Sequence, residues 1–418
     1  MMQGAFRVTF LGTSSGGGPS ESRNCSSLVC DVVGDGTLWM VDCAEGTNRQ
    51  FAFQDRSSTN LRSNKVTKMF ITHMHADHIM GIIPFLRNIL YPPPVAKPFP
   101  VSKPPAIEIY GPCGIRAFVR QVMKMTCTRT ADFWTVHELL TPTDRKTPCL
   151  PHSDAADSTY ELDVMHKTEV AGRDIMCSED GFWKAFTVSQ SLFGELFVDA
   201  GPISHRDPCL GYVIREAAGP MRKLVILGDT SDASAIIPLC VNPPPSLLVH
   251  EATDAHIPRH VDYNATRTPE AVLDKALSRG HSIPSMAGAF AKSIGAERLV
   301  LNHIGGRFPA PKYARDRRTA VMKEIEKQAT QAWGSKTRAI AAYDFMQVII
   351  PPVLPTPREA DTESDNEESN EEERGSPMDA IQTAETVTMQ LHHADPNEGF
   401  LYASKKRGRG DRDRRRRR

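Results

Sequence analysis

The chain has 418 residues, of which 40% are hydrophobic and 24% are charged, and its 50 Lys and Arg balance its 50 Asp and Glu. This length and composition allow a large buried core, which excludes a mini-protein that depends on disulfides and a fibrous or wholly disordered protein. There is no apolar run of the roughly 20 residues that a membrane span needs, and the residues after Met1 lack the apolar stretch of a signal peptide, so we expect a protein of the nucleus, the cytoplasm or both that is not secreted.

The N-terminal third alternates predicted strands with loops and helices. Apolar or alternating runs bounded by glycine and polar residues predict strands over residues 6–11, 27–33, 37–42, 65–72 and 107–110. The sequence Gly34-Asp35-Gly36 predicts a hairpin between the second and third of these. Longer apolar stretches predict helices over 79–90 and 114–125, and the proline-rich residues 92–105 predict a loop.

The rest of the chain continues this alternation after one irregular segment. Periodicity fades over residues 145–185, which we interpret as an insert. Strands are predicted over 186–198, 210–215, 223–227 and 298–301, and helices over 269–279, 285–294 and 313–331. Strands interleaved with helices indicate an α/β architecture with more than one sheet layer.

The charges near the C-terminus are segregated by sign. Residues 359–373 hold nine acids and no base, whereas residues 405–418 hold ten bases and two acids. Residues 359–418 together carry 11 bases and 15 acids, so 39 bases and 35 acids remain before them, a net charge of +4. Such runs cannot pack a core, and we predict a folded domain over 1–350 followed by a disordered Pro-, acid- and Arg-rich tail over 351–418. The Arg run is either a nuclear-import signal or RNA contact, or a solvated tail without a dedicated role.

The densest cluster of metal-ligating residues follows the strand predicted over 65–72. It comprises His73, His75, Asp77 and His78, and imidazole combined with carboxylate suits zinc or another borderline divalent ion. Three further polar residues follow apolar strands in the same way, and they are His205, Asp229 and His303. Taken singly, each is better interpreted as a structural histidine or a turn aspartate. Taken together with the first cluster, they supply the ligands of a two-metal centre.

This ligand pattern resembles that of the metallo-β-lactamase superfamily. The resemblance implies a four-layer αββα sandwich, an α/β or α+β fold, with a dinuclear metal site. Further stretches resemble ribonuclease Z, the family of endonucleases that trims the 3′ end of precursor tRNA, and they run in the family's order. They are 10–13 with 16–19 (FLGT, GGGP), 23–27 (RNCSS), 42–50 (DCAEGTNRQ), 205–212 (HRDPCLGY), 228–230 (GDT), 250–253 (HEAT) and 302–308 (NHIGGRF).

The resemblance implies a role for each candidate site residue. The implied ligands of one metal ion are His73, His75 and His205, those of the other are Asp77, His78 and His303, and Asp229 bridges the two. The ions are expected to be two Zn²⁺, or Mn²⁺ or another divalent ion in their place, and they would activate a water molecule for attack on a phosphodiester.

Three residues are implied in proton transfer. Asp77 is expected to be the base beside the attacking water, and Glu251 with His281 the pair that protonates the leaving 3′ oxygen. The implied products are a tRNA with a 3′ hydroxyl and a trailer with a 5′ phosphate. A homodimer is also expected, because members of the family usually dimerise.

The sequence departs from the ribonuclease Z pattern where that family contacts RNA. The loop after the first strand commonly carries Pro-x-Lys-x-Arg in the family, whereas this chain has Pro19-Ser20-Glu21-Ser22-Arg23, with an acid in place of the lysine. The resemblance implies an exosite arm over residues 145–185, where the family carries a basic arm that grips tRNA, but these residues hold five bases and eight acids. Acids repel phosphate, so both departures reduce the expected attraction to RNA.

Three functions are therefore open at the level of the sequence. The first is a zinc-dependent endoribonuclease that acts on precursor tRNA. The second is a hydrolase of small phosphodiesters or aryl sulfate-like esters on the same fold, which Glu21 and the acidic insert favour. The third is a catalytically silent RNA-processing scaffold, and retention of every predicted ligand argues against it, because buried imidazoles and carboxylates aimed at one point have no structural use.

Overall fold

The computed structural model describes residues 4–54, 61–91, 103–217, 221–313 and 315–353. The tail predicted over 351–418 lies outside the described residues except for its first three positions, and so does most of the loop predicted over 92–105. No helix in the described part of the chain combines the length and the apolar character needed to cross a membrane. The division into a domain over 1–350 and a disordered tail stays a prediction.

The first β-sheet has nine strands, in the order β16-β1-β2-β3-β4-β5-β6-β7, with β8 also paired to β6. The strands from β3 to β6 run parallel to one another, so their carboxyl ends lie at the same edge of the sheet. The members are β1 (Phe6–Gly12), β2 (Ser27–Asp31), β3 (Leu38–Val41), β4 (Val66–Phe70), β5 (Ile107–Pro112), β6 (Trp134–Leu140), β7 (Glu169–Val170), β8 (Asp174–Met176) and β16 (Gln347–Ile350).

The second sheet has seven strands, in the order β15-β14-β13-β12-β11-β10-β9. The four strands from β12 to β15 are parallel, and β9 to β12 are antiparallel. The members are β9 (Trp183–Ser191), β10 (Gly194–Ile203), β11 (Cys209–Glu216), β12 (Lys223–Leu227), β13 (Leu247–Glu251), β14 (Leu299–Asn302) and β15 (Ile340–Ala341).

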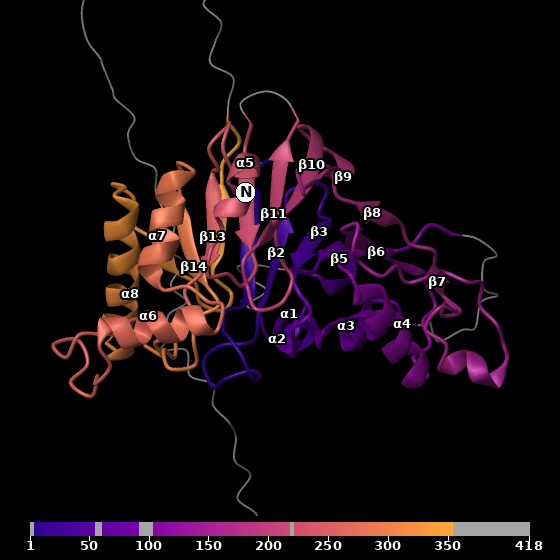
Figure 1. Cartoon of the computed structure of the whole chain (residues 1–418), viewed down its shortest axis with the longest axis horizontal. Coiled ribbons are helices and arrows are strands. Elements are labelled where there is room, and N and C mark those ends of the chain that lie inside the picture. The colour runs from indigo at the N-terminus through magenta and orange to yellow at the C-terminus, as the bar shows by residue number, and fades with distance from the viewer. Residues whose placement is uncertain (1–3, 55–60, 92–102, 218–220, 314, 354–418) are drawn as a thin grey trace, which may run out of the picture. The chain divides into compact units, whose positions relative to one another are not determined.

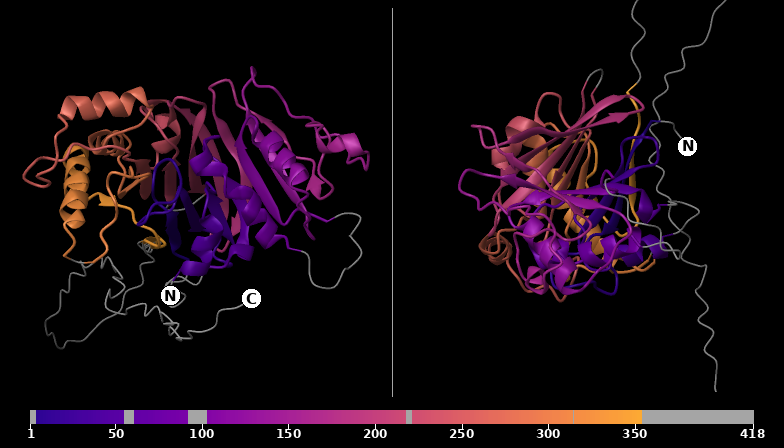
Figure 2. Two further views of the ribbon diagram at one scale, coloured as in Figure 1. Left: turned by 90° about the horizontal axis from the view of Figure 1, so that it is seen from below. Right: turned by 90° about the vertical axis from the view of Figure 1, so that its right-hand side faces the viewer.

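Helices cover the outer faces of the two sheets (Figures 1 and 2). Apolar side chains form one core between the sheets and a further core beneath each helical layer. The helices are α1 (Thr47–Phe53), α2 (Ala76–Ile79), α3 (Ile82–Ile89) and α4 (Ile115–Met125) on the first sheet, and α5 (Ile237–Cys240), α6 (Pro269–Ser278), α7 (Pro284–Ser293) and α8 (Arg318–Trp333) on the side of the second, with single turns at η1 (Ser63–Lys65), η2 (Ala156–Thr159) and η3 (Ser234–Ile236). The expected four-layer αββα sandwich is therefore confirmed.

The helix predicted over 79–90 is confirmed as α3, but α3 begins only at Ile82, because a break separates it from α2, which ends at Ile79. The break lies at Gly81, whose amide donates to the carbonyl of Cys43 at 2.8 Å. A Cβ atom at Gly81 would lie 1.9 Å from the carbonyl oxygen of Ala44. The two backbones can approach this closely only because residue 81 has no side chain. The short helix α2 thereby carries Asp77 and His78 toward the sheet edge.

Other elements also differ from the sequence-based prediction. The strand predicted over 186–198 is a hairpin of β9 and β10, which turns before Gly194, where φ is 116°, a value that favours glycine. The helix predicted over 313–331 begins only at α8, where the Asp316 side chain accepts from the amide of Arg318 at 3.0 Å. Several elements were not predicted from the sequence, among them β13 and β6, in which polar residues interrupt the apolar ones.

Residues 145–185 are packed against the rest of the fold by two fully buried arginines of α4. Arg116 donates to the carbonyl of Thr147 and to the carboxylate of Asp174, both at 2.7 Å. Arg120 forms an ion pair with Glu169 at 2.8 Å and donates to the carbonyl of Pro148 at 2.6 Å. The segment extends the first sheet through β7 and β8. A tRNA-binding role for this segment stays a prediction.

Candidate functional site

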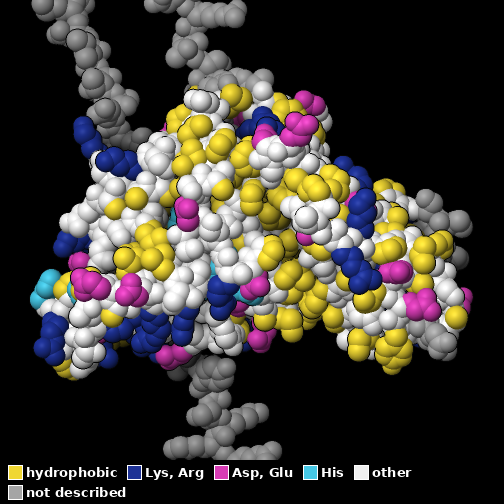
Figure 3. Space-filling model, in the orientation of Figure 1, with side chains coloured by type: hydrophobic (Ala, Val, Ile, Leu, Met, Phe, Trp, Pro, Cys, Tyr) yellow, Lys and Arg dark blue, Asp and Glu magenta, His cyan; other side chains and the backbone are white. Residues whose placement is uncertain are grey.

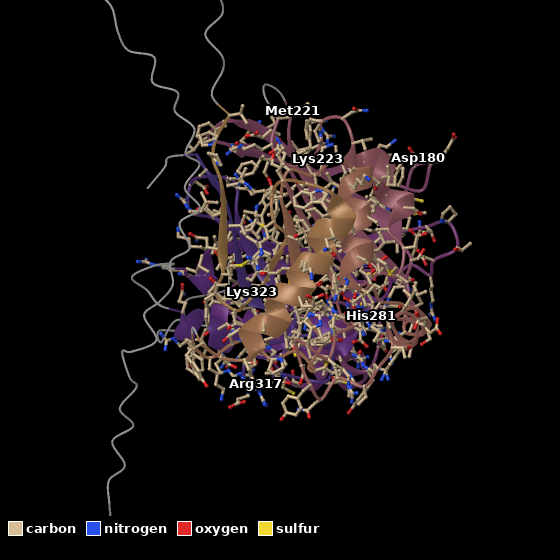
Figure 4. The ribbon with its side chains drawn as sticks, turned by 90° about the vertical axis from the view of Figure 1, so that its left-hand side faces the viewer. Asp180, Met221, Lys223, His281, Arg317 and Lys323 are labelled. Atoms are coloured by element: carbon tan, nitrogen blue, oxygen red, sulfur yellow. The ribbon has the colours of Figure 1, made fainter. Side chains whose placement is uncertain are left out.

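The residues of the predicted ligand set come together at one edge of the two sheets. His73 follows β4, Asp229 follows β12 and His303 follows β14, so each lies just beyond the carboxyl end of its strand. Side chains at this edge of parallel strands converge, which is the usual position of a site in an α/β fold. Figure 4 shows the neighbouring His281 toward the same end of the molecule as Arg317 at the start of α8.

One cluster contains His73, His75, His205 and Asp229, whose ligand atoms all lie within 4.8 Å of one another. The Nδ1 atom of His75 is 2.9 Å from Nε2 of His73 and 3.3 Å from Nε2 of His205. The Oδ2 atom of Asp229 lies 3.7 Å from Nε2 of His73. Three imidazole nitrogens and one carboxylate oxygen therefore face a common point.

A second cluster contains Asp77, His78 and His303. The Nε2 atom of His303 is 3.3 Å from both Nε2 of His78 and Oδ2 of Asp77. The Oδ1 atom of Asp229 lies 3.5 Å from Nε2 of His78. Asp229 thus directs one carboxylate oxygen toward each cluster, which is the arrangement of a bridging ligand.

These separations fit divalent ions. Two nitrogen ligands about 2.0–2.1 Å from one zinc ion at a tetrahedral angle lie about 3.3–3.4 Å apart, close to the separations in both clusters. The charge states also fit. Burial lowers the pKa of His73 to about 2, so its imidazole is neutral. Burial opposes ionisation of Asp77 and Asp229, but the neighbouring histidines outweigh it and hold the pKa of each carboxyl below its usual range.

Asp42 holds two of these histidines in place from outside the clusters. It follows β3, adopts the left-handed φ of 56° and accepts from the Thr72 hydroxyl at 2.9 Å and from Nδ1 of His78 at 2.7 Å. The Thr72 hydroxyl donates its only proton to Asp42, so it accepts from Nδ1 of His73 at 3.0 Å. Nε2 of both histidines therefore carries no proton and keeps the lone pair that a metal ligand requires.

The other three histidines are oriented by partners of the same kind. Nδ1 of His205 lies 2.6 Å from the carbonyl of Gly280, and Nε2 of His75 lies 2.7 Å from the carboxylate of Asp207. Nδ1 of His303 lies 2.9 Å from the hydroxyl of Thr253. These partners and Asp42 were not among the candidate residues predicted from the sequence. Asp42 could have been found, since it ends an apolar strand like the other candidates, but the remaining contacts depend on loop geometry.

We expect Asp42→Asn to weaken metal binding by about 10- to 100-fold, because the amide cannot accept from both His78 and Thr72. Titration of the protein with zinc against a chromogenic chelator measures this affinity. The exposed Asp180→Asn is the matched control and should bind zinc as the wild type does. Equal affinity in Asp42→Asn and the wild type would show that Asp42 does not orient the ligands.

Glu251 and His281 form a separate pair beside the second cluster. Nδ1 of His281 lies 3.0 Å from Oε1 of Glu251, which is 2% exposed. Glu251 also accepts from the amide of Thr230 at 2.7 Å and from the hydroxyl of Thr253 at 2.5 Å. Burial would lower the pKa of His281, but the hydrogen bond and the charge of Glu251 outweigh it and raise that pKa. His281 is thus suited to donate a proton.

A cleft of about 550 Å³ is lined by members of both clusters, which are His75, Asp77, Asp229 and His303, and by His281. The backbone of Gly16 forms part of its lining and donates to Oδ2 of Asp77 at 2.6 Å. Arg206, Lys275, Arg279 and Arg307 add four cationic side chains to the lining. A cleft with these cations and convergent carboxylates and imidazoles suits hydrolysis of an anionic ester.

Arg23, which the resemblance placed in an RNA-contacting loop, is directed into the fold. It is 3% exposed and donates to the hydroxyl of Thr13 at 2.7 Å and to the carbonyl of Ala342 at 2.6 Å. The guanidinium of Arg23 is buried and already bonded to these acceptors, so in this structure it cannot contact RNA.

Sequence comparisons find relatives over most of the chain. Zinc phosphodiesterase ELAC protein 1 from Homo sapiens is 31% identical over 399 residues, which covers 82% of this chain and 98% of that protein. Ribonuclease Z from Streptococcus sanguinis is 31% identical over 346 residues, which covers 77% of this chain and 98% of that protein. A family model described as Anti-Pycsar protein Apyc1 matches residues 6–98.

The structure comparison agrees with the sequence comparisons. The crystal structure of the short form of human tRNase Z superposes with a TM-score of 0.55 at 31% identity and covers 83% of this chain and 100% of that chain. This agreement extends across both sheets and not only the stretch around the histidine cluster.

Proposed function

Because the chain belongs to the ribonuclease Z family of metallo-β-lactamase-fold proteins, we propose that it is a metal-dependent endoribonuclease that removes the 3′ trailer from precursor tRNA. The observation that carries this proposal is the position of His281, which Glu251 contacts at 3.0 Å, in a cleft that members of both ligand clusters also line. One cleft thus combines a site for divalent ions with a proton donor for a leaving oxygen.

We propose two zinc ions as the cofactor, with manganese or another divalent ion as a substitute. Their ligands would be His73, His75 and His205 for one ion, and Asp77, His78 and His303 for the other, with Asp229 shared. When bound, such ions lower the pKa of a shared water and offset the charge that develops on a phosphodiester in the transition state.

Three side chains of the protein are proposed to accept, donate or position the protons of the reaction. Asp77 is the proposed base, since its carboxylate is ionised and the Gly16 amide fixes Oδ2 in the cleft at 2.6 Å. His281 donates a proton to the leaving 3′ oxygen, and Glu251 holds its Nδ1–H so that Nε2 faces the cleft. The products are a tRNA with a 3′ hydroxyl and a trailer with a 5′ phosphate.

Incubation of the protein with an end-labelled precursor tRNA, with and without chelator, tests this proposal. We expect one cut at the 3′ end of the tRNA body, loss of the cut with chelator, and its return when zinc or manganese is restored. A chromogenic phosphodiester in parallel reports on the metal site alone. Turnover of the small ester with intact precursor tRNA would contradict the proposed substrate.

A second candidate function is hydrolysis of small phosphodiesters or aryl sulfate-like esters. The acidic composition of residues 145–185 and the buried position of Arg23 favour it, because neither provides the RNA contacts expected of the family. The same parallel assay separates the two functions.

The homodimer expected from the resemblance is part of the proposal, and light scattering after gel filtration would test it. A location in the nucleus, the cytoplasm or both also remains a proposal, for which fluorescence microscopy of the tagged full chain is the test.

A further inference from the structure

The cleft has four cationic side chains that form no hydrogen bond or ion pair with other described residues, although Arg206 interacts electrostatically with the neighbouring Asp207. They are Arg206, Lys275, Arg279 and Arg307. By contrast, Arg267 near the same cleft is paired with Asp254 at 2.5 Å. Figure 3 shows Lys and Arg side chains gathered at lower left, over the region of α6. Unpaired cations around an anion-cleaving site are available to bind substrate phosphates.

The family's first-strand loop cannot supply these phosphate contacts in this chain. Arg23 is buried against Thr13 and the carbonyl of Ala342, and residue 21 is an acid. Positive charge for the substrate backbone must therefore come from other segments that reach the cleft.

Three of the cations lie beside His281. Lys275 and Arg279 are four residues apart on α6 and its C-cap, so they project on the same side of the helix, and Gly280 and His281 follow directly. Arg206 packs against this segment, since a Cβ atom at Gly280 would lie 2.9 Å from the Arg206 amide nitrogen and 3.1 Å from its Cγ. Arg307 belongs to another segment, the loop after His303. In this loop the carbonyl of Ile304 accepts a hydrogen bond from the amide of Ser15 at 3.1 Å.

We infer that Arg206, Lys275 and Arg279 bind the backbone phosphates on the tRNA side of the cut. The inference rests on the proposed function. His281 donates its proton to the leaving 3′ oxygen, and that oxygen belongs to the last nucleotide of the tRNA. In an in-line displacement the leaving nucleotide lies on the side of the proton donor, so its 5′ phosphate lies toward the cations that flank His281. The trailer extends from the other side of the scissile phosphorus.

The test compares Lys275→Gln/Arg279→Gln with the wild type. Removing two phosphate contacts should raise KM for precursor tRNA by about 100-fold, with kcat nearly unchanged, and should reduce the slope of log(kcat/KM) against log[salt] by about 1 per cation. Arg206→Gln should raise KM by about tenfold. A chromogenic phosphodiester has no second phosphate for these cations to bind, so its hydrolysis should fall much less than cleavage of precursor tRNA in the same variants. The control Lys292→Gln/Lys323→Gln removes two exposed lysines of α7 and α8 and should leave every value unchanged.

The side of the cut is tested with a substrate that carries one neutral methylphosphonate. Placed at the first phosphate 5′ of the scissile bond, it should weaken cleavage by the wild type but cause no further loss in Lys275→Gln/Arg279→Gln. Placed 3′ of the scissile bond, it should affect both enzymes equally. Equal KM values in variant and wild type, or coupling only at the 3′ phosphate, would overturn the inference and leave the proposed function intact. Failure of the wild type to cut precursor tRNA would contradict both.

Discussion

Asp229→Ala should release metal and abolish hydrolysis of both precursor tRNA and a chromogenic phosphodiester. Asp229 is 2% exposed, and its two oxygens face His73 of one cluster and His78 of the other. Alanine removes the only carboxylate that both clusters share, so neither retains its full set of donors. We expect a fall in kcat of at least about 10³-fold, or about 4 kcal/mol of transition-state stabilisation, with either substrate.

Metal content per chain after gel filtration, measured by mass spectrometry, separates this effect from unfolding. Circular dichroism should show the wild-type secondary structure, because Asp229 lies at the sheet edge and not in the apolar cores. Asp232→Ala is the matched control, since this exposed aspartate lies three residues further along the same loop. A variant of Asp229 with full metal content and normal rates would remove Asp229 from the bridging position.

The ligand set could be assembled from the sequence because of a topological regularity. His73, Asp229 and His303 each follow an apolar strand, and the carboxyl ends of parallel strands converge, so the convergence of these three residues follows from a pattern visible in the chain. The same rule would have selected Asp42. The resemblance to a known family added the division of the ligands between two ions, which residue types alone left open.

The parts that sequence patterns missed depend on contacts between distant segments. The break at Gly81 exists because the backbone of residues 43–44 contacts it. Hydrophobic periodicity reports only on nearby residues, so it cannot reveal this contact. Arg23 belongs to the loop that contacts RNA in the family, but it donates to Thr13 and Ala342 and is directed into the fold. The packing of residues 145–185 likewise depends on Arg116 and Arg120. The sequence pattern indicates an amphipathic helix with these arginines at its surface, whereas the structure buries both.

Glu251→Gln and His281→Ala should leave metal content near normal and slow cleavage of precursor tRNA by about 10²- to 10⁴-fold. Neither residue belongs to the two ligand clusters that Asp229 joins. In His281→Ala the leaving 3′ oxygen has no proton donor. In Glu251→Gln the amide cannot accept from all of the groups that now donate to the carboxylate, which include Thr230, Thr253 and His281, so the imidazole loses the partner that fixes its tautomer.

The choice of substrate distinguishes this role from one in metal binding. A nitrophenolate leaves without being protonated, so His281→Ala should hydrolyse the chromogenic diester at a rate close to that of the wild type, in contrast to Asp229→Ala, which should hydrolyse neither substrate. His281 and Asp229 also form a ligand-like group with His303, so metal analysis is required for each variant. If His281→Ala loses both metal and both activities, His281 is a metal ligand. The proposal that it donates a proton to the leaving 3′ oxygen would then be wrong.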